Sequence, residues 1–202
     1  MASWDAAWLA LGRPAPEGLQ VDLMNAWAEP HGHHHDQRHL RECLALGARW
    51  CGHRDRAGEV GLALWFHDAI YDPQAGSNEL NSAAWAARSL IRAGLASETA
   101  QRVHDLVMAT QHDAPATGAD AQLLVDIDLA ILGSPPERFE RYDQDVRKEN
   151  AWVPGFRYRD QRAQVLRGFL DRPRLHHGDA AVALLEGQAR LNLAAALSRL
   201  AQ

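Results

Sequence analysis

The sequence predicts an all-α protein that folds as a single globular domain of roughly eight to ten helices. Apolar residues recur at helical spacing along most of the 202 residues. Strand patterns are scarce, and no linker rich in glycine, serine or proline divides the chain. With 47% hydrophobic residues, a chain of this length is expected to form one domain over 1–202, with its core at about 20–195.

Proline and glycine mark the ends of the helices expected in the first half. EGLQVDLMNAWAEP is expected to end at Pro30, and RHLRECLALGARWC has apolar residues at every third or fourth position. EVGLALWFHDAIYDP is apolar on almost every side up to residue 66, which predicts a buried helix. SNELNSAAWAARSLIRAGL is expected to start after Gly76 and to end near Gly94.

The second half continues the helical pattern. SETAQRVHDLVMATQH has one apolar stripe, and the length of DAQLLVDIDLAILG favours a helix ending at Gly133 over a strand. SPPE predicts a capping box, with Ser134 as the N-cap, Glu137 three residues on and Pro135 in the first helical position. A last helix is expected from about Asp179 to the end.

Composition limits the compartment and the partners. The formal net charge of −5 argues against a broad basic surface, so no nucleic-acid polymer is expected as a partner. The N-terminus is a poor signal peptide and no run approaches about 18 apolar residues, so a cytoplasmic protein with no membrane partner is expected. Cys43 and Cys51 are too far apart on one helix for a disulfide, which predicts small core residues in a reducing compartment.

Two apolar runs carry polar residues whose burial would cost free energy. His67 and Asp68 end the buried helix, and Asp126 and Asp128 interrupt LLVDIDLAIL. A buried carboxylate is usually paired or bound to a metal. On a helix Asp126 and Asp128 lie about 200° apart; Asp128 shares the apolar stripe, so it is expected to point inward and Asp126 to be solvated or behind the site. The alternative is that these residues reach water or arginines at helix ends.

EPHGHHHDQRHL contains five of the eleven histidines. His39 lies on an apolar helical stripe, and His35 lies one turn earlier on the same side. His31, His33 and His34 precede them and are expected to be exposed. A single histidine on an apolar face is usually an ordinary core residue. His39 is therefore a candidate ligand only because other helices also carry polar residues that are expected to point inward.

Three helices could therefore bring together His39, His67, Asp68 and Asp128. Two imidazoles and two carboxylates suit a borderline divalent metal and leave positions open for water. One ion would stabilise every buried polar group of the set. The ligands are compatible with Mn, Fe, Ni, Co, Zn or Mg, so the sequence leaves the divalent metal unidentified.

The ordered pattern His…His-Asp…Asp on an all-α chain resembles the HD-domain superfamily of metal-dependent phosphohydrolases. EPHGHHHDQRHL, WFHDAIYDP, SNELNSA, LLVDIDLAILG, VRKENAWVP and EGQARLNL are similar, in this order, to a bacterial branch of predicted HD-superfamily phosphohydrolases. The resemblance implies His39 as the first metal ligand, His67 and Asp68 as the HD pair and Asp128 as the last ligand.

The chain also resembles cyclic-nucleotide phosphodiesterases, in which a histidine four residues before the first ligand protonates the leaving group. That residue would be His35, although those enzymes have Tyr-His-Asn where this chain has His34-His35-Asp36. Asn78 and Glu79 match a family segment near the site. The resemblance gives them a supporting or water-positioning role, with Asn78 near the substrate.

The expected activity is hydrolysis of a small-molecule phosphate ester, with a nucleotide as the favoured class. The metal would lower the pKa of its bound water to create the attacking hydroxide beside Asp68, and His35 would protonate the leaving oxygen. VRKENAWVPGFRYRDQR supplies candidate phosphate contacts, and Tyr158 could stack on a base. The substrate-binding candidates are His112, Arg147, Lys148, Tyr158 and Arg162, each of which could instead be an ordinary helix-end or surface residue.

Two alternatives remain. HDQRH imitates the zinc-peptidase signature with Asp36 in place of the general-base glutamate, but a peptidase leaves Asp68 and Asp128 unexplained. A non-catalytic domain that senses a nucleotide would keep the same fold. The sequence leaves open the substrate, the choice between mono- and diester, the number of ions and the oligomeric state.

Overall fold

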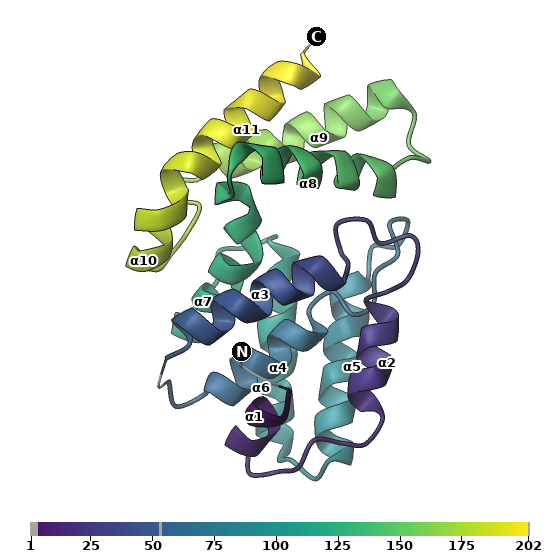
Figure 1. The fold of residues 1–202 in the computed structure, drawn as a ribbon, viewed down its shortest axis with the longest axis vertical. Coiled ribbons are helices and arrows are strands. Elements are labelled where there is room, and N and C mark those ends of the chain that lie inside the picture. Colours follow the sequence, from purple (N-terminus) through teal and green to yellow (C-terminus); the bar gives the residue numbers. More distant parts are fainter. Residues whose placement is uncertain (1–3, 53, 202) are drawn as a thin grey trace. The chain divides into compact units, whose positions relative to one another are not determined.

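The computed structural model describes residues 4–52 and 54–201, and every regular element within these ranges is helical (Figure 1). Ten of the described α-helices have seven or more residues, which confirms the all-α prediction. The chain divides into two compact units, one ending at Ile127 and one beginning at Asp128. The single domain stays a prediction, and each unit is described by itself. None of the described helices is long and apolar enough to cross a membrane.

The N-terminal unit is built around α4, which is apolar on all sides. Residues 58–66 of this helix are all buried, as the sequence predicted. The helices and short turn of this unit are α1 (Trp4–Ala10), α2 (Leu19–Ala26), α3 (Gln37–Trp50), α4 (Ala57–Phe66), α5 (Asn78–Arg92), α6 (Ser97–Met108), η1 (Ala109–Gln111) and α7 (Ala119–Asp128), of which the last residue begins the second unit.

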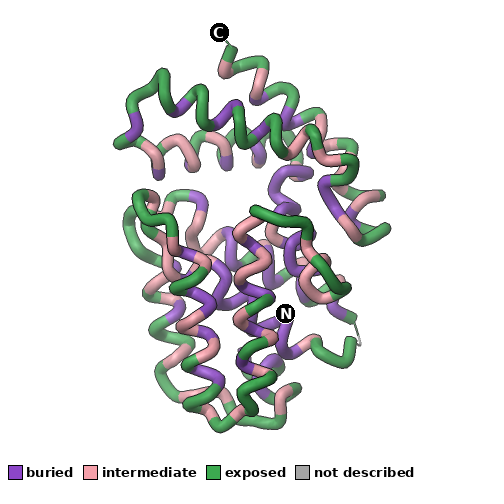
Figure 2. The backbone as a smooth tube through the Cα atoms, turned by 180° about the vertical axis from the view of Figure 1, so that it is seen from behind, coloured by how far each residue is buried: buried purple, intermediate pink, exposed green. Residues whose placement is uncertain are grey.

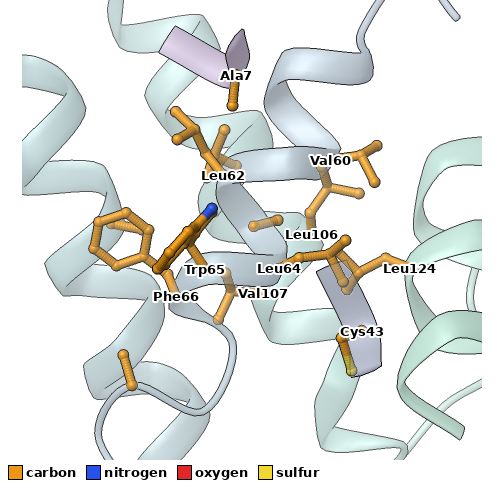
Figure 3. Packing of buried hydrophobic residues seen from close by; sticks show 14 of the residues in the cluster. Ala7, Cys43, Val60, Leu62, Leu64, Trp65, Phe66, Leu106, Val107 and Leu124 are labelled. Atoms are coloured by element: carbon orange, nitrogen blue, oxygen red, sulfur yellow. The ribbon is translucent and has the colours of Figure 1, made fainter. Parts of the chain in front are cut away.

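The side chains of α4 pack in several directions. Figure 3 shows Val60 and Leu64 pointing to one side of the helix and Trp65 to another. The neighbouring helices are amphipathic, so buried and exposed residues alternate along them (Figure 2). The only charged side chain buried within α4 is Glu59, which accepts hydrogen bonds from the Arg102 guanidinium at 2.6 to 3.2 Å.

Gly47 allows α3 to lie close to α4. A Cβ at this position would be 2.7 Å from Leu64 Cδ1, well inside van der Waals contact. Gly47 lies one turn after Cys43 and two turns after His39 on the same helical face. The close approach therefore brings the face that carries these two residues against the end of α4.

The C-terminal unit packs three long helices against a short 3₁₀ segment. Phe139, Leu166 and Leu193 are almost completely buried in it. The Asn192 amide donates to the backbone carbonyls of Leu132 and Ser134, at 2.8 and 2.9 Å, and so holds the segment. The elements are η2 (Leu129–Gly133), α8 (Pro136–Glu149), α9 (Gly155–Leu170), α10 (Asp179–Ala181), the π-helical turn η3 (Val182–Glu186) and α11 (Gly187–Leu200).

The predicted capping box is wrong. α8 begins at Pro136, and its N-cap is Pro135, without a side-chain cap. A residue before proline avoids the α conformation, so the Pro135–Pro136 pair keeps both Ser134 and Pro135 extended, with ψ of 163° and 146°. Ser134 is consequently one residue too early to cap the helix.

Other boundaries differ by a few residues. α2 ends at Ala26, before the expected Pro30. The helix expected to end at Gly133 is α-helical to Asp128 and then narrows to the 3₁₀ segment η2. The final helix begins at Asp179, as expected, but contains a π-helical turn.

Candidate metal centre

Asp36 fixes the start of α3, the helix that carries His39. It is the N-cap residue, and its carboxylate accepts hydrogen bonds from the backbone N–H groups of Arg38 and His39, at 2.8 and 3.1 Å. The cap satisfies donors that a helix start would leave unpaired. Because this carboxylate is engaged by the backbone of its own helix, its geometry argues against the general-base role that a zinc peptidase would require.

His67 is the C-cap residue of α4 and is fully buried. Its Nδ1 lies 2.9 Å from the carbonyl oxygen of Leu64. Since a carbonyl can only accept, Nδ1 carries the proton and donates it. In the neutral ring Nε2 would then carry the lone pair, the arrangement in which a backbone partner orients a metal-binding histidine.

His39, His67 and Asp68 converge. The two Nε2 atoms are 3.3 Å apart. Asp68 Oδ2 lies 3.3 Å from His67 Nε2 and 3.8 Å from His39 Nε2. His39 is 2% exposed and the Asp68 side chain 12%. Three of the four residues predicted as ligands therefore meet at one point, from α3 and from the end of α4.

The fourth predicted ligand, Asp128, belongs to a group that also contains Cys43. Ligand atoms of His39, Cys43, His67 and Asp128 all lie within 4.8 Å of one another. Asp128 is the last residue of α7, whose Leu124 and Ile127 pack in the N-terminal core. Imidazole, thiol and carboxylate are all ligands of borderline divalent metals, so this group could hold a metal ion.

Cys43 was predicted only as a small core residue. It is 1% exposed, and its Sγ lies 3.7 Å from both ring nitrogens of His39. Burial alone would raise the pKa of this thiol, but His39 and His67 together outweigh burial and lower the pKa below its ordinary value. The i, i+4 spacing from His39 was the signal available in the sequence.

Aromatic rings enclose the imidazoles. The Trp27 ring centroid lies 5.3 Å from that of His67, and Trp27 Nε1 donates to the carbonyl oxygen of Trp65 at 3.0 Å. The ring centroids of His34 and His39 are 4.5 Å apart, and His34 is 4% exposed. The prediction that His34 is exposed is therefore wrong, because the turn before α3 folds this side chain inward; His31 and His33 are exposed as predicted.

His35 lies at the edge of the group. Its Nε2 is 3.9 Å from Asp68 Oδ2, and its side chain is 23% exposed. The ring stacks on Tyr71 with centroids 3.9 Å apart and an interplanar angle of 26°. His35 thus combines access to solvent with a fixed position beside Asp68, as a proton donor to a substrate would require.

Two side chains of α5 hold the loop that follows Asp68. The Asn78 amide oxygen accepts from the N–H of Asp72, and its amide nitrogen donates to the Asp72 carbonyl, at 3.0 and 2.9 Å. One turn on, Ser82 Oγ accepts from Ile70 N–H at 2.9 Å. The structure thus shows Asn78 as a clamp for the loop carrying Tyr71, and its role toward a substrate stays a prediction.

Glu79 and Asp126, the two remaining acidic residues of the predicted site, differ in how deeply they are buried. Glu79 is half-buried in the first turn of α5, beside Asn78, and its catalytic role stays a prediction. Asp126 is 1% exposed. A solvated Asp126 is therefore excluded, and this residue is more deeply buried than Asp128, which is half-buried.

His112 lines a separate cavity of about 490 Å³ in the N-terminal unit, with Arg56, Asp105 and Gln111 among the other lining residues. Its backbone has φ 58° and ψ 12°, in the left-handed region, where it ends η1. Histidine is one of the residues that tolerate this conformation. The geometry favours the helix-terminal alternative for His112.

The predicted phosphate contacts gather in the C-terminal unit. Arg147, Lys148 and Tyr158 line a cavity of about 610 Å³. Arg147 donates to the carbonyl oxygens of Asn150 and Val153, at 2.7 and 3.3 Å, and its guanidinium lies 4.5 Å from the centroid of the Tyr158 ring. Lys148 is more than half exposed but pairs with Asp145 at 2.7 Å.

Arg162 and Tyr158 are largely buried. Arg162 donates to Asp143 Oδ1 from Nε and Nη2, at 3.1 and 3.0 Å. Burial raises the pKa of Tyr158 to about 12, against a smaller opposing effect of Arg162, so the phenol is neutral near pH 7. The structure gives Arg147 and Arg162 internal partners, and their contacts with a substrate stay predictions.

Comparisons of the whole chain add no relative. No protein-family model, no curated protein and no solved structure matches it.

Proposed function

We propose that this protein is a metal-dependent phosphohydrolase of the HD type that cleaves the phosphate ester of a small molecule, with a nucleotide as the proposed class. The observation that carries the proposal is the convergence of His39, His67 and Asp68, with Nε2 and Oδ2 atoms 3.3 to 3.8 Å apart. Asp128 offers a carboxylate oxygen within 4.8 Å of ligand atoms of His39 and His67.

The chemistry of the donors supports a bound divalent ion. His39, Cys43, His67 and Asp128 offer two imidazoles, a thiol and a carboxylate within 4.8 Å of one another, and Asp68 Oδ2 lies 3.3 Å from His67 Nε2. The Leu64 carbonyl oxygen fixes the His67 ring through Nδ1. A divalent ion held there would supply Lewis acidity, by lowering the pKa of water and by neutralising negative charge on a phosphoryl group.

The chain's own residues would supply positioning and proton transfer. Asp68 would orient the attacking water by accepting its hydrogen bond, and Trp27 would keep bulk water away from the imidazoles. His35 would donate a proton to the leaving oxygen, and the stacked Tyr71 ring would hold it in place. The clamp formed by Asn78 and Ser82 would keep the Tyr71 ring stacked on His35.

A metal-reloading screen tests the proposal. Metal-free protein is reloaded separately with Mn, Fe, Ni, Co, Zn and Mg, and release of phosphate from nucleotides and hydrolysis of phosphodiesters are measured. We expect turnover with at least one metal. His67→Ala and Asp68→Ala should lose bound metal and activity together.

Three outcomes would contradict the proposal. Full metal content in both variants would exclude these residues as ligands. Tight nucleotide binding without turnover under every metal would indicate a sensing domain. Cleavage of casein without phosphate release would indicate a peptidase.

A further inference from the structure

The thiol of Cys43 lies within the group proposed to hold the metal. It comes from α3, one turn after His39, and reaches 3.7 Å from the His39 Nε2 atom. Its ligand atom, like those of His67 and Asp128, is within 4.8 Å of every other member of the group. The close approach of α3 to α4 at Gly47 places the thiol beside both imidazoles.

Two spacings in this group, Nε2 to Nε2 and Nε2 to Sγ, are close to those of a tetrahedral zinc shell. With Zn–N bonds of about 2.05 Å and a Zn–S bond of about 2.3 Å, two nitrogens lie about 3.3 Å apart and a nitrogen and a sulfur about 3.6 Å apart. The observed distances are 3.3 Å between the two Nε2 atoms and 3.7 Å from Nε2 to Sγ. An octahedral shell at about 2.1 Å would bring neighbouring oxygens or nitrogens to about 3.0 Å.

We infer that Cys43 is a metal ligand, and that with His39 and His67 it selects a thiophilic ion, zinc in the first place, over magnesium or manganese. The thiol would release its proton to solvent as the metal–sulfur bond forms. Thiolate favours zinc and other softer ions, whereas magnesium and manganese prefer oxygen ligands. The inference rests on the proposed function only in that both use the same ion.

The carboxylates would complete the shell. Three protein ligands with a fourth position left to water or substrate is the usual arrangement of a catalytic zinc, and a set of thiolate and imidazole ligands is compatible with it. Asp128 belongs to the same group, and Asp68 meets the two imidazoles at 3.3 and 3.8 Å. Either carboxylate could bind the ion or orient a water beside it.

X-ray absorption of the zinc-loaded protein tests the inference directly. We expect one sulfur scatterer at about 2.3 Å from zinc. The cobalt(II) form should show a thiolate-to-cobalt charge-transfer band in the near ultraviolet. Both signals should be absent from Cys43→Ser and present in Cys51→Ser, which changes the other cysteine, buried at the end of the same helix.

Metal competition gives a second readout. Cys43→Ser should lower the preference for zinc over manganese by about 100-fold, at least as much as loss of an outer-shell partner costs. Cys51→Ser should keep the wild-type preference. Circular dichroism establishes that each variant is folded, and the wild-type absorption spectrum decides the matter even if Cys43→Ser does not fold.

The outcomes separate the inference from the proposed function. Bound zinc without a sulfur scatterer, in a protein that hydrolyses phosphate esters, overturns the inference alone. A zinc–sulfur bond in a protein without phosphohydrolase activity overturns the proposed function and supports the inference. A protein that binds none of the metals overturns both.

Discussion

Two sites that combine buried histidine with a carboxylate, one in each unit, differ in what surrounds that carboxylate. In the C-terminal unit Glu186 accepts from the N–H groups of Leu175 and His176, from His176 Nδ1 and from Arg190, at 2.9 to 3.1 Å. In the N-terminal unit Asp68 faces the nitrogens of His35, His39 and His67 at 3.3 to 3.9 Å.

The difference indicates which of the two sites is the better candidate for holding a metal ion. An arginine and three N–H donors balance Glu186, so its charge is compensated within the protein. The other site brings together two imidazoles, a thiol and a carboxylate, all of which are metal-ligand types. A buried histidine is therefore a weak indicator of a metal by itself, and its neighbours decide.

The largest expected effect comes from substituting His67, with a substitution of His176 as the comparison. His67→Ala should lose the bound metal and lower activity by about 10³-fold, because a metal supplies several kcal/mol of transition-state stabilisation. His176→Gln should keep metal content and lower only the free energy of unfolding. Elemental analysis of the purified proteins, phosphate release and urea unfolding check this. Equal loss of metal in both variants would contradict the assignment of the metal to the site of His67.

A smaller effect is expected from the internally balanced carboxylate. Glu186→Gln should lower the free energy of unfolding by about 2 kcal/mol at neutral pH, since hydrogen bonds to a charged group are lost. Burial alone would raise the pKa of Glu186, but its N–H donors, His176 and Arg190 outweigh it and lower the pKa below 4.5. The carboxylate therefore stabilises the fold above pH 4.5, and this contribution is lost as the pH falls through the folded-state pKa.

Urea titrations of wild type and Glu186→Gln at neutral and acidic pH measure this dependence. The difference between the two proteins should narrow on acidification. Glu140→Gln is the control, because Glu140 forms an exposed pair with Arg199 at 3.8 Å and should change stability by less than about 1 kcal/mol. A difference for Glu186→Gln that stays constant with pH would contradict the balance proposed for that cluster.

Periodicity predicted the parts of the fold and site that depend on one helix at a time. The burial of α4 and the inward face of His39 follow from apolar residues at helical spacing. The inward turn of His34 depends on a loop, and the extended Ser134 depends on two successive prolines. Neither has a periodic signal.

Cys43 shows more clearly what periodicity along a single helix does not predict. Its position on the stripe of His39 was predictable, but its contact with a second imidazole depends on the distance between α3 and α4, which Gly47 sets.

The segments SNELNSA and EGQARLNL resemble those of the enzyme family, but the structure shows structural contacts for several of their residues. Their Asn78, Ser82 and Asn192 bind backbone atoms of loops and segment ends, so part of the resemblance to a family of enzymes lies in structural residues.

Asn78→Ala tests the distinction between residues that bind the proposed metal and residues that only hold the neighbouring loop. Loss of both Asp72 hydrogen bonds should lower stability by about 1–2 kcal/mol and should lower kcat by loosening Tyr71 beside His35, with metal content unchanged. Asn81→Ala is the matched control, because Asn81 is exposed one turn away on α5 and bonds only Ser77 among the contacts described. Loss of metal from Asn78→Ala would assign it a role at the metal itself.

The smallest expected effect is at the cap of α3. Asp36→Ala should lower the free energy of unfolding by about 1 kcal/mol, because the N–H groups of Arg38 and His39 lose their acceptor. Asp36→Asn should restore most of that stability, since asparagine caps a helix as well as aspartate does. Activity of Asp36→Asn should stay near the wild-type value, because a cap needs an oxygen acceptor whereas a general base needs a titratable carboxylate. A loss of activity in Asp36→Asn as large as in His67→Ala would instead favour the peptidase-like role of HDQRH.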